Sequence, residues 1–269
     1  LVRRMRASFL TLGPLLARFG SAHVSRPGGC AIGSRPVDIH LEGMRRLGAK
    51  VELWGGYADA KAKRLRGGHV IFTMPSVGAT ENVMMAAALA DGTTRIENAA
   101  REPEIVDLAD ALVKMGARIR GAGSSVIEID GVKKLGGMTH AVIPDRIVAG
   151  TFLIGAAMTG GDVYVRGARA DHLESLIELL MQAGCKIDID ALGVRARGGE
   201  AQDALTAGVS QPHFDEFDAG GIAAHVDFFQ HAGLYRACLV VLQCQRDASI
   251  QQVAIPHDLL PGRFECRRL

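Results

Sequence analysis

The sequence predicts an α/β fold in which repeated βαβαββ units surround buried helices, an inside-out α/β barrel. Three evenly spaced glycines mark the repeat: Gly48, Gly116 and Gly184 stand 68 residues apart, each between an amphipathic helix and a short strand. A fixed period of this length is typical of stacked supersecondary units. The first helix of each unit has little polar surface, so we expect sheets to cover the helices, the reverse of most α/β proteins.

Each unit is expected to begin with a helix of small and apolar residues that a glycine ends. These helices are predicted over residues 7–18, 81–90 and 149–158, followed by Gly20, Gly92 and Gly160. Glycine adopts the left-handed conformation that commonly closes a helix. A short strand with alternating apolar residues comes next, over residues 22–26, 94–98 and 162–166.

An amphipathic helix follows in each unit, because apolar residues recur at helical spacing. Its apolar positions are Val37, Leu41 and Met44 in the first unit, Ile105, Leu108, Leu112 and Met115 in the second, and Leu173, Leu176, Ile177 and Leu180 in the third. A second strand is predicted over residues 50–53, 118–120 and 186–189. The first two units are expected to add a hairpin, with residues 125–129 as one of its strands.

The first unit differs from the others by four additional residues in the loop over residues 26–36. This loop contains three glycines and Cys30 between Arg26 and Arg35. Glycines let a loop approach a ligand closely, and the arginines favour the thiolate, so Cys30 is a candidate acid or nucleophile. A lone loop cysteine is more often only a small side chain. The insertion in a single unit favours the chemical interpretation, since packing needs shared by all three units do not explain it.

Composition excludes several functional classes. The chain has 269 residues, 48% of them hydrophobic, and a net charge of +2, which is too small to indicate a nucleic-acid partner. Five cysteines without CxxC pairs or metal-ligand spacing predict no metal and a reduced, cytoplasmic setting. No apolar run approaches the length of a membrane span. The start lacks a signal peptide, and we expect it to lie inside a longer protein.

Several sequence blocks in the same order resemble the family of UDP-N-acetylglucosamine 1-carboxyvinyltransferases, also called UDP-N-acetylglucosamine enolpyruvyl transferases. The resemblance runs from about residue 1 to 199, with blocks at residues 5–8, 12–15, 27–33, 35–40, 75–80, 97–104 and 144–146. The related shikimate-pathway enolpyruvyl transferase shares the fold but lacks the cysteine loop.

The resemblance implies a transferase that moves the enolpyruvyl group of phosphoenolpyruvate to the 3′-hydroxyl of UDP-N-acetylglucosamine and releases phosphate. This is the first committed step of peptidoglycan synthesis, and hence of cell-wall biogenesis, cell shape and cell division. It implies addition and then elimination through a tetrahedral intermediate. It also implies no metal and no organic cofactor, and its partners are the two small-molecule substrates, with no nucleic acid and no membrane; the oligomeric state stays open.

The resemblance further implies roles for individual residues. Cys30 matches the family's loop cysteine, the proposed proton donor to the phosphoenolpyruvate methylene and the residue that fosfomycin alkylates. The matched substrate-binding residues are Arg6, Arg35, Pro36, Val37, Asp38, Ile39, Ser76 and Val77. Arginines suit the phosphate and carboxylate groups of these substrates, because the guanidinium binds such anions through two parallel hydrogen bonds.

Some of these residues have a purely structural alternative. Arg6 is also explained as a solvated charge on a helix, and Asp38 and Ser76 are also explained as caps of the helices predicted to begin near Pro36 and Gly78. We interpret His40 as structural. We interpret Asp145 and Arg146 as a crossing between domains, at a hinge.

The resemblance predicts a partial first domain over residues 1–143 that carries the cysteine loop, and the start of a second domain over residues 144–199. The fold is therefore expected to be incomplete at both ends, without the family's lysine–asparagine pair, second-domain catalytic aspartate and second-domain arginines. Residues 200–269 show no resemblance: a fourth unit would place glycines near positions 228 and 252, which hold Phe228 and Gln252. We interpret this tail as frameshifted or disordered.

The sequence leaves three functional hypotheses open. The chain is a fragment or damaged copy of the transferase with weak or no activity, a UDP-sugar-binding remnant without chemistry, or another enolpyruvyl transferase of the same fold. A purely structural repeat protein is a further alternative, which the Cys30 loop argues against.

Overall fold

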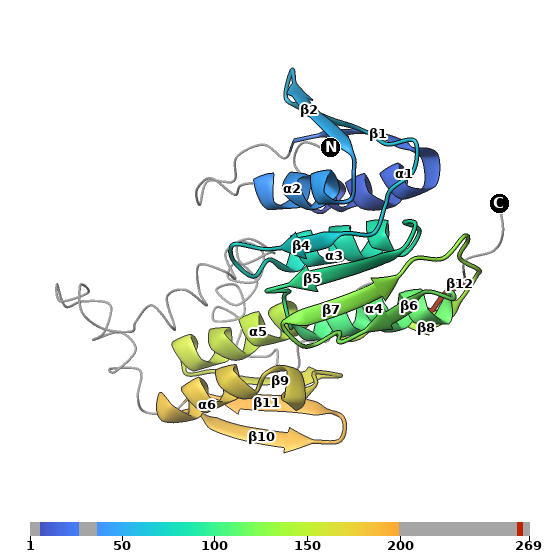
Figure 1. The fold of residues 1–269 in the computed structure, drawn as a ribbon. Helices are drawn as coiled ribbons and strands as arrows, with labels where there is room; N and C mark the ends of the chain where they lie inside the picture. Colours follow the sequence, from blue (N-terminus) through green and yellow to red (C-terminus); the bar gives the residue numbers. More distant parts are fainter. Residues whose placement is uncertain (1–5, 27–36, 199–262, 266–269) are drawn as a thin grey trace. The chain divides into compact units, whose positions relative to one another are not determined.

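The computed structural model describes residues 6–26, 37–198 and 263–265 of the chain (Figure 1). It contains two compact units, Leu1–Val142 with Arg263–Leu269, and Ile143–Gly262. The cysteine loop and most of the tail lie outside the described residues. The predicted domain boundaries and the interpretation of the tail stay predictions.

The middle copy of the repeat is a complete βαβαββ unit. Its elements are β4 (His69–Ile71), α3 (Val77–Ala87), β5 (Thr93–Glu97), α4 (Pro103–Lys114), β6 (Arg118–Arg120) and β7 (Val126–Asp130). The strands form one sheet in the order β4-β5-β7-β6, in which β4 runs parallel to β5 and the other pairs are antiparallel. The last strand therefore inserts between the two strands that precede it in the unit.

The first copy repeats this arrangement. Its elements are the 3-10 helix η2 (Arg6–Thr11), α1 (Leu12–Phe19), β1 (Ser21–Ser25), α2 (Asp38–Arg46), β2 (Lys50–Trp54) and β3 (Tyr57–Lys61). The sheet order β1-β3-β2 matches β5-β7-β6, and both pairs are antiparallel, with Ser21 opposite Lys61 and Ser25 opposite Tyr57. The helix expected over residues 7–18 is thus a 3-10 helix that continues as an α-helix.

The second compact unit holds the third copy. Its elements are α5 (Arg146–Thr159), β9 (Asp162–Arg166), the 3-10 helix η3 (Ala170–His172), α6 (Glu174–Gln182), β10 (Lys186–Asp190) and β11 (Gly193–Arg197). The sheet order β10-β11-β9 is again the same. The expectation that only the first two copies add a hairpin is wrong, because β10 and β11 pair over five residues. In the first unit, β8 (Thr139–Ala141) pairs antiparallel with β12 (Arg263–Glu265).

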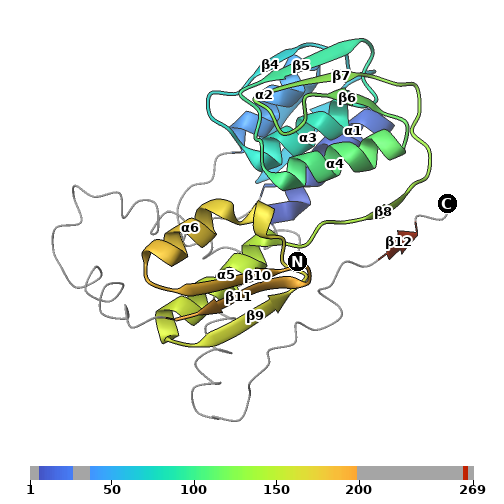
Figure 2. The ribbon, with the colours of Figure 1, turned by 90° about the horizontal axis from the view of Figure 1, so that it is seen from below.

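Helix α3 lies at the centre of the first unit, against α1, α2 and α4. Its buried residues cover more than half of its circumference: Ala79, Thr80, Asn82, Val83, Met84, Ala86 and Ala87. The sheet of the middle copy covers α3 and α4 from outside (Figure 2). No residue of α3 is exposed, in line with the predicted burial of this helix, although Glu81 and Met85 on one side are only half-buried. The same prediction is wrong for α1, where Phe19 is 66% exposed, because α1 packs its apolar residues on one side only.

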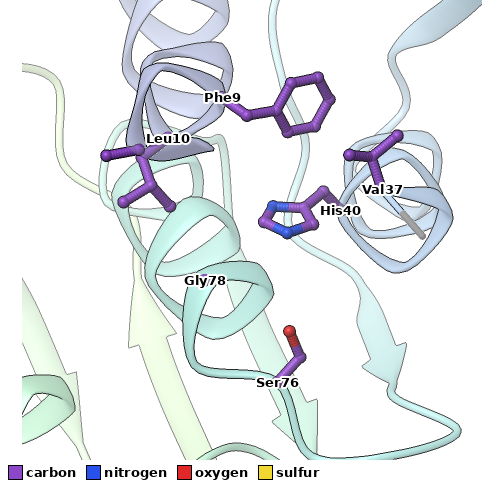
Figure 3. Close-up of a pocket in the computed structure, with 7 residues that line it drawn as sticks. Phe9, Leu10, Val37, His40, Ser76 and Gly78 are labelled. Atoms are coloured by element: carbon purple, nitrogen blue, oxygen red, sulfur yellow. The ribbon is translucent and has the colours of Figure 1, made fainter. Parts of the chain in front are cut away.

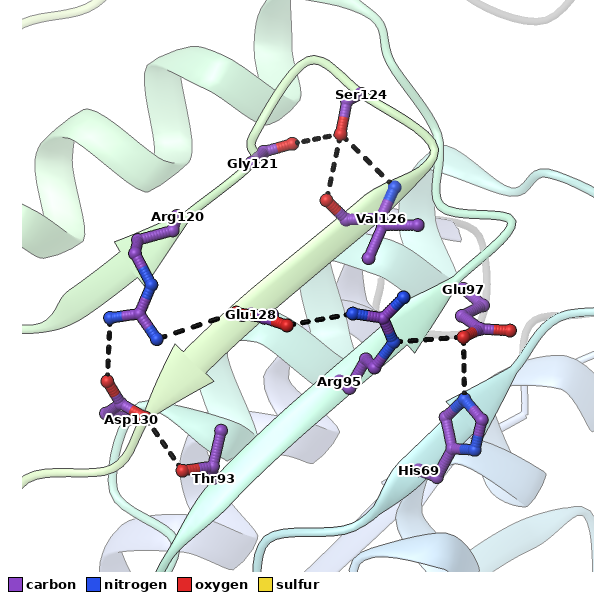
Figure 4. Close-up of polar contacts among 10 residues, drawn as sticks. All are labelled: His69, Thr93, Arg95, Glu97, Arg120, Gly121, Ser124, Val126, Glu128 and Asp130. Atoms are coloured by element: carbon purple, nitrogen blue, oxygen red, sulfur yellow. Dashed lines mark hydrogen bonds and ion pairs between the residues drawn. The ribbon is translucent and has the colours of Figure 1, made fainter.

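The outer face of the β4-β5-β7-β6 sheet carries a ladder of charged side chains (Figure 4). Arg95 contacts Glu97 at 3.0 Å and Glu128 at 2.8 Å, and Arg120 contacts Asp130 at 2.9 Å. Cross-strand pairs of opposite charge stabilise a sheet modestly when solvent surrounds them. The charged face outside and the apolar helices inside explain why this α/β unit has its sheet on the surface.

Two helices begin earlier than the sequence pattern predicts, because polar residues cap them. Ser76 caps α3, so the helix starts at Val77, close to the start near Gly78 that the capping alternative predicts and earlier than the start at residue 81 that the apolar pattern predicts. Asp145 caps α5, and its Oδ1 accepts from the backbone N–H of Ile147 at 2.8 Å and of Val148 at 3.1 Å. A side-chain oxygen at this position satisfies helix N–H groups that have no partner inside the helix. The helix ends at Gly20 and Gly160 are confirmed, and both glycines are left-handed.

Helices α1 and α3 approach so closely that a glycine is required at their contact. A Cβ atom added to Gly13 would lie 2.3 Å from the carbonyl oxygen of Asn82 and 2.6 Å from its Oδ1. The first of these atoms belongs to the backbone of α3 and cannot move without shifting the helix. Gly13 therefore sets the distance between the two helices.

We predict that Gly13→Ala lowers the free energy of unfolding by about 1–3 kcal/mol, since the two helices must move apart and lose contacts. Chemical denaturation measures the change. Gly136→Ala is the matched control, because its added Cβ would meet only the carbonyl oxygen of Met115 at an ordinary 3.6 Å. Equal stability of the two variants would contradict the close approach of α1 and α3.

Candidate functional site

A cavity of about 230 Å³ lies at the N-terminal end of α3, where three segments of the chain converge. The segments are η2, the start of α2 and the start of α3 (Figure 3). The lining residues are Ala7, Phe9, Leu10, Val37, His40, Ser76 and Gly78. The cavity is mostly apolar with a few polar groups, which is the usual composition of a small-molecule site.

Ser76 lines the cavity and caps the first turn of α3. Its Oγ accepts from the backbone N–H of Ala79 at 3.4 Å, and its carbonyl oxygen accepts from Thr80 N at 2.9 Å and Thr80 Oγ1 at 2.8 Å. The N-terminal turn of an α-helix presents N–H groups and a partial positive charge. The start of α3 therefore favours an anionic or oxygen-rich ligand group in the cavity.

The buried side chain of Asn82 holds the walls of the cavity together. Its Oδ1 accepts from the backbone N–H of Gly13 at 2.6 Å, and its Nδ2 donates to the carbonyl oxygen of Phe9 at 3.0 Å. The same Nδ2 lies 3.1 Å from Nδ1 of His40. One amide thus joins η2, α1 and α2 to α3. Because Asn82 is fully buried, losing these bonds would leave polar groups unsatisfied at high cost.

His40 forms one wall of the cavity and is 5% exposed. Its ring meets the edge of Phe9, with ring centroids 5.3 Å apart and planes at 83°. A Cβ atom on Gly78 would come within 3.1 Å of the His40 ring, so the absence of a side chain there makes room for the imidazole. The sequence interpretation took His40 as structural and did not place it at a cavity.

The structure brings only some of the predicted site residues together. Val37 and Ser76 both line the cavity although they are far apart in the sequence, and Val77 is the first residue of α3. Asp38 and Ile39 lie in the first turn of α2 and do not line it. Arg6 begins η2, and its side chain is outside the described residues, as are Cys30, Arg35 and Pro36. The roles of all these residues stay predictions.

The two capping alternatives have different outcomes. Ser76 does cap α3, so its structural role and its place in the cavity coexist. Asp38 is not the cap of α2: the residue in that position is Val37, which makes no side-chain cap bond, and Asp38 is the first helical residue. A carboxylate there still suits the positive end of the helix. Asp145, interpreted from sequence as part of a hinge, caps α5.

Glu81 is an unusual acid on α3 that the sequence did not single out. Burial, and after it the negative charges of Glu104 and Glu102, raise its pKa from 4.5 to about 7. Glu102 and Glu104 lie at the start of α4, which packs against α3. Glu81 therefore changes charge near neutral pH, when most carboxyl groups are already ionised.

The second unit contains a separate cavity of its own. A more open cavity of about 690 Å³ lies in the second unit, lined by Ala170, Asp171, Glu174, Ile177, Glu178, Met181, Gln182 and Ile189. None of the predicted site residues is among these. Among the described residues, no group of three His, Cys, Asp or Glu side chains is placed to hold a metal ion. No described helix combines the length and apolar character needed to cross a membrane.

A family model described as EPSP synthase (3-phosphoshikimate 1-carboxyvinyltransferase) matches residues 1–209. A curated UDP-N-acetylglucosamine 1-carboxyvinyltransferase of Azorhizobium caulinodans is 60% identical over 198 residues, covering 73% of this chain and 46% of that protein. UDP-N-acetylglucosamine 1-carboxyvinyltransferase 1 of Caldanaerobacter subterraneus subsp. tengcongensis is 57% identical over 198 residues, covering 74% and 48%. The resemblance noted in the sequence is confirmed, and the chain spans about half the length of the curated relatives it matches.

Solved structures support the fold. The enolpyruvyl transferase NikO from Streptomyces tendae matches with a TM-score of 0.58 and 24% identity, covering 71% of this chain and 47% of that chain. EPSP synthase from Acinetobacter baumannii matches with a TM-score of 0.52 and 22% identity, covering 73% and 47%. At this identity the likeness concerns the fold alone. It confirms the inside-out α/β architecture, although the described strands form separate sheets and no closed barrel.

The raised pKa of Glu81 predicts a pH-dependent stability. The unfolded carboxyl ionises near pH 4.5 and the folded one near pH 7, so the free energy of unfolding should fall as the pH rises between these values. We predict that Glu81→Gln removes this fall and stabilises the protein by about 1–3 kcal/mol at pH 8. Denaturant titrations at pH 5 and pH 8 measure the free energy of unfolding of both proteins. Glu52→Gln, on the exposed strand β2, is the control; a wild-type protein equally stable at both pH values would contradict the prediction.

Proposed function

The chain belongs to the EPSP synthase (3-phosphoshikimate 1-carboxyvinyltransferase) family, and we propose that it contributes the nucleotide-sugar site of a UDP-N-acetylglucosamine 1-carboxyvinyltransferase. The observation that carries this proposal is the 55–60% identity to curated proteins of that name over about 200 residues. Relatives of the other named type, the EPSP synthases of known structure, share only 22–23% identity. The substrate assignment follows the more similar group.

The proposed reaction joins phosphoenolpyruvate to the 3′-hydroxyl of UDP-N-acetylglucosamine. The thiol of Cys30 would give its proton to the methylene carbon, while the sugar oxygen forms a bond to the neighbouring carbon and loses its own proton. Loss of a proton from the new methyl group and cleavage of the carbon–oxygen bond to phosphate would then complete the transfer. Arg6 and Arg35 would bind the anionic groups of the substrates. The protein would act in the cytoplasm, in peptidoglycan synthesis.

The geometry of the cavity supports the nucleotide-sugar part of this proposal. Val37 and Ser76, two of the residues that the resemblance matches to substrate binding, line the same cavity. The positive end of α3 is available to a diphosphate there, as helix N-termini are in many phosphate sites. Pro36, Asp38, Ile39 and Val77 are the further proposed contacts, on either side of these two residues.

A remnant that binds the nucleotide sugar without chemistry is the second candidate. The observation that favours it is the extent of the match, since the chain corresponds to 46–49% of each curated relative. We propose that residues 1–143 form the first domain, residues 144–199 start a second, and residues 200–269 do not contribute to the site. Binding without turnover separates this candidate from the enzyme.

The proposed function predicts that the chain binds UDP-N-acetylglucosamine, which isothermal titration calorimetry measures. The test pair is Ser76→Asn and Ser76→Asp, because both side chains cap a helix well while only Asp adds a negative charge. We expect Ser76→Asn to bind nearly as the wild type does and Ser76→Asp to bind at least about tenfold more weakly, since like charges repel at the diphosphate. No binding by the wild type would refute the proposed function, and equal binding by both variants would refute the diphosphate position.

The proposed function also makes a prediction about phosphate release. Phosphate release from phosphoenolpyruvate and UDP-N-acetylglucosamine is expected to be weak or absent with this chain, because the chain spans about half the length of the curated relatives it matches. The assay compares wild type with Cys30→Ser. Clear phosphate release that Cys30→Ser abolishes would show an active enzyme and exclude the remnant. Equal, background release by both proteins, together with binding of the nucleotide sugar, would favour the remnant.

A further inference from the structure

We propose that His40 is a ligand-binding residue whose Nε2–H donates a hydrogen bond to an oxygen of the bound nucleotide sugar, and that Asn82 sets the tautomer that makes this possible. The inference rests on the proposed function, since it assigns a further contact in the same cavity. It replaces the purely structural interpretation of His40 that the sequence suggested.

The first step is the orientation of the Asn82 amide. Its two backbone partners are of opposite kind: the N–H of Gly13 can only donate, and the carbonyl oxygen of Phe9 can only accept. The oxygen of the amide must therefore face Gly13, and its nitrogen must face Phe9. Exchanging the two atoms would break both bonds, so the hydrogen-bond network assigns the amide without ambiguity.

The second step follows for the imidazole. The amide nitrogen that faces Phe9 also lies 3.1 Å from Nδ1 of His40, and an amide nitrogen has only hydrogens to offer. Nδ1 of His40 must then accept, which means that it carries no proton. In a neutral imidazole the other nitrogen carries the proton, so Nε2 is a donor. Asn82 acts on the ligand through His40 and is a positioning residue.

The third step is the place of Nε2. A Cβ on Gly78 would lie 3.6 Å from it, so Nε2 sits beside the first turn of α3. Figure 3 shows the ring between Phe9 and the end of α3 that bears Ser76 and Gly78. The positive end of the helix and a neutral N–H donor therefore face the same small volume. Together they suit the oxygens of a diphosphate, which need donors and favour positive potential.

Two substitutions of His40 separate ligand binding from structure. The amide of Gln reaches the position of Nε2, whereas the amide of Asn reaches the position of Nδ1. His40→Gln should therefore keep the donor for the ligand and lose the contact with Asn82. His40→Asn should keep an acceptor for Asn82 and lose the donor for the ligand.

Calorimetry with UDP-N-acetylglucosamine and thermal unfolding test both variants. We expect His40→Gln to bind within about threefold of wild type and His40→Asn to bind at least about tenfold more weakly, while His40→Asn is the more stable of the two. Affinity that follows stability, with His40→Asn binding like wild type, would overturn the proposal.

A spectroscopic measurement on the wild type does not depend on how the variants fold. Long-range ¹H–¹⁵N correlation spectra should show His40 protonated on Nε2 only, and its Nε2 signal should shift on adding UDP-N-acetylglucosamine. UDP alone should give the same shift and phosphoenolpyruvate alone none. Protonation on Nδ1, or binding without a shift, would refute the inference and leave the proposed function intact. A wild type that binds no nucleotide sugar would refute the proposed function and the inference with it.

Discussion

The structure of the first unit depends on one buried amide. Asn82, on the central helix α3, bonds to the backbone of η2 and of α1 and contacts His40 on α2, so three segments are fixed to α3 by a single side chain. A fully satisfied buried network of this kind specifies one packing arrangement, because every alternative leaves polar groups without partners. The absence of a side chain at Gly13 allows the close approach, and the cavity at the start of α3 exists because these segments converge there.

The architecture around this amide follows from where charge and apolar surface lie along the repeat. Charged residues alternate on the outer face of the β4-β5-β7-β6 sheet, whereas Ile96, Ile127 and Ile129 point inward and are fully buried. A strand that alternates charged and apolar residues can bury only its apolar face against the core. The small and apolar surface of α3 then provides the surface that the sheet covers. The N-terminus of the same helix lines the cavity, so one element serves both the core and the candidate site.

The sequence was sufficient for the repeat and for most of the element order, because the glycines that end helices and the period-2 strands are local signals, and for the family, because several sequence blocks match in the same order; the hairpin of the third copy was missed. Helix starts were less predictable: the sequence offered both Ser76 and Asp38 as caps but only Ser76 is one, and it did not identify Asp145 as the cap of α5, because a capping residue resembles any other polar loop residue until the first turn is known. The polar network was invisible in the sequence, since Asn82 and Gly13 are far apart along the chain and meet only through helix packing. Glu81 was missed for the same reason, because its neighbours come from another helix.

Hydrogen exchange at the backbone amide of Gly13 tests the role of Asn82 most directly. Gly13 is the second residue of α1, where a helix amide normally lacks an acceptor inside the helix and exchanges quickly. Here the amide donates to the buried Oδ1 of Asn82, so the account predicts exchange only through global unfolding, as slow as at Ile96 and Ile127 in the core strands. Exchange as fast as at a fraying helix end would contradict it.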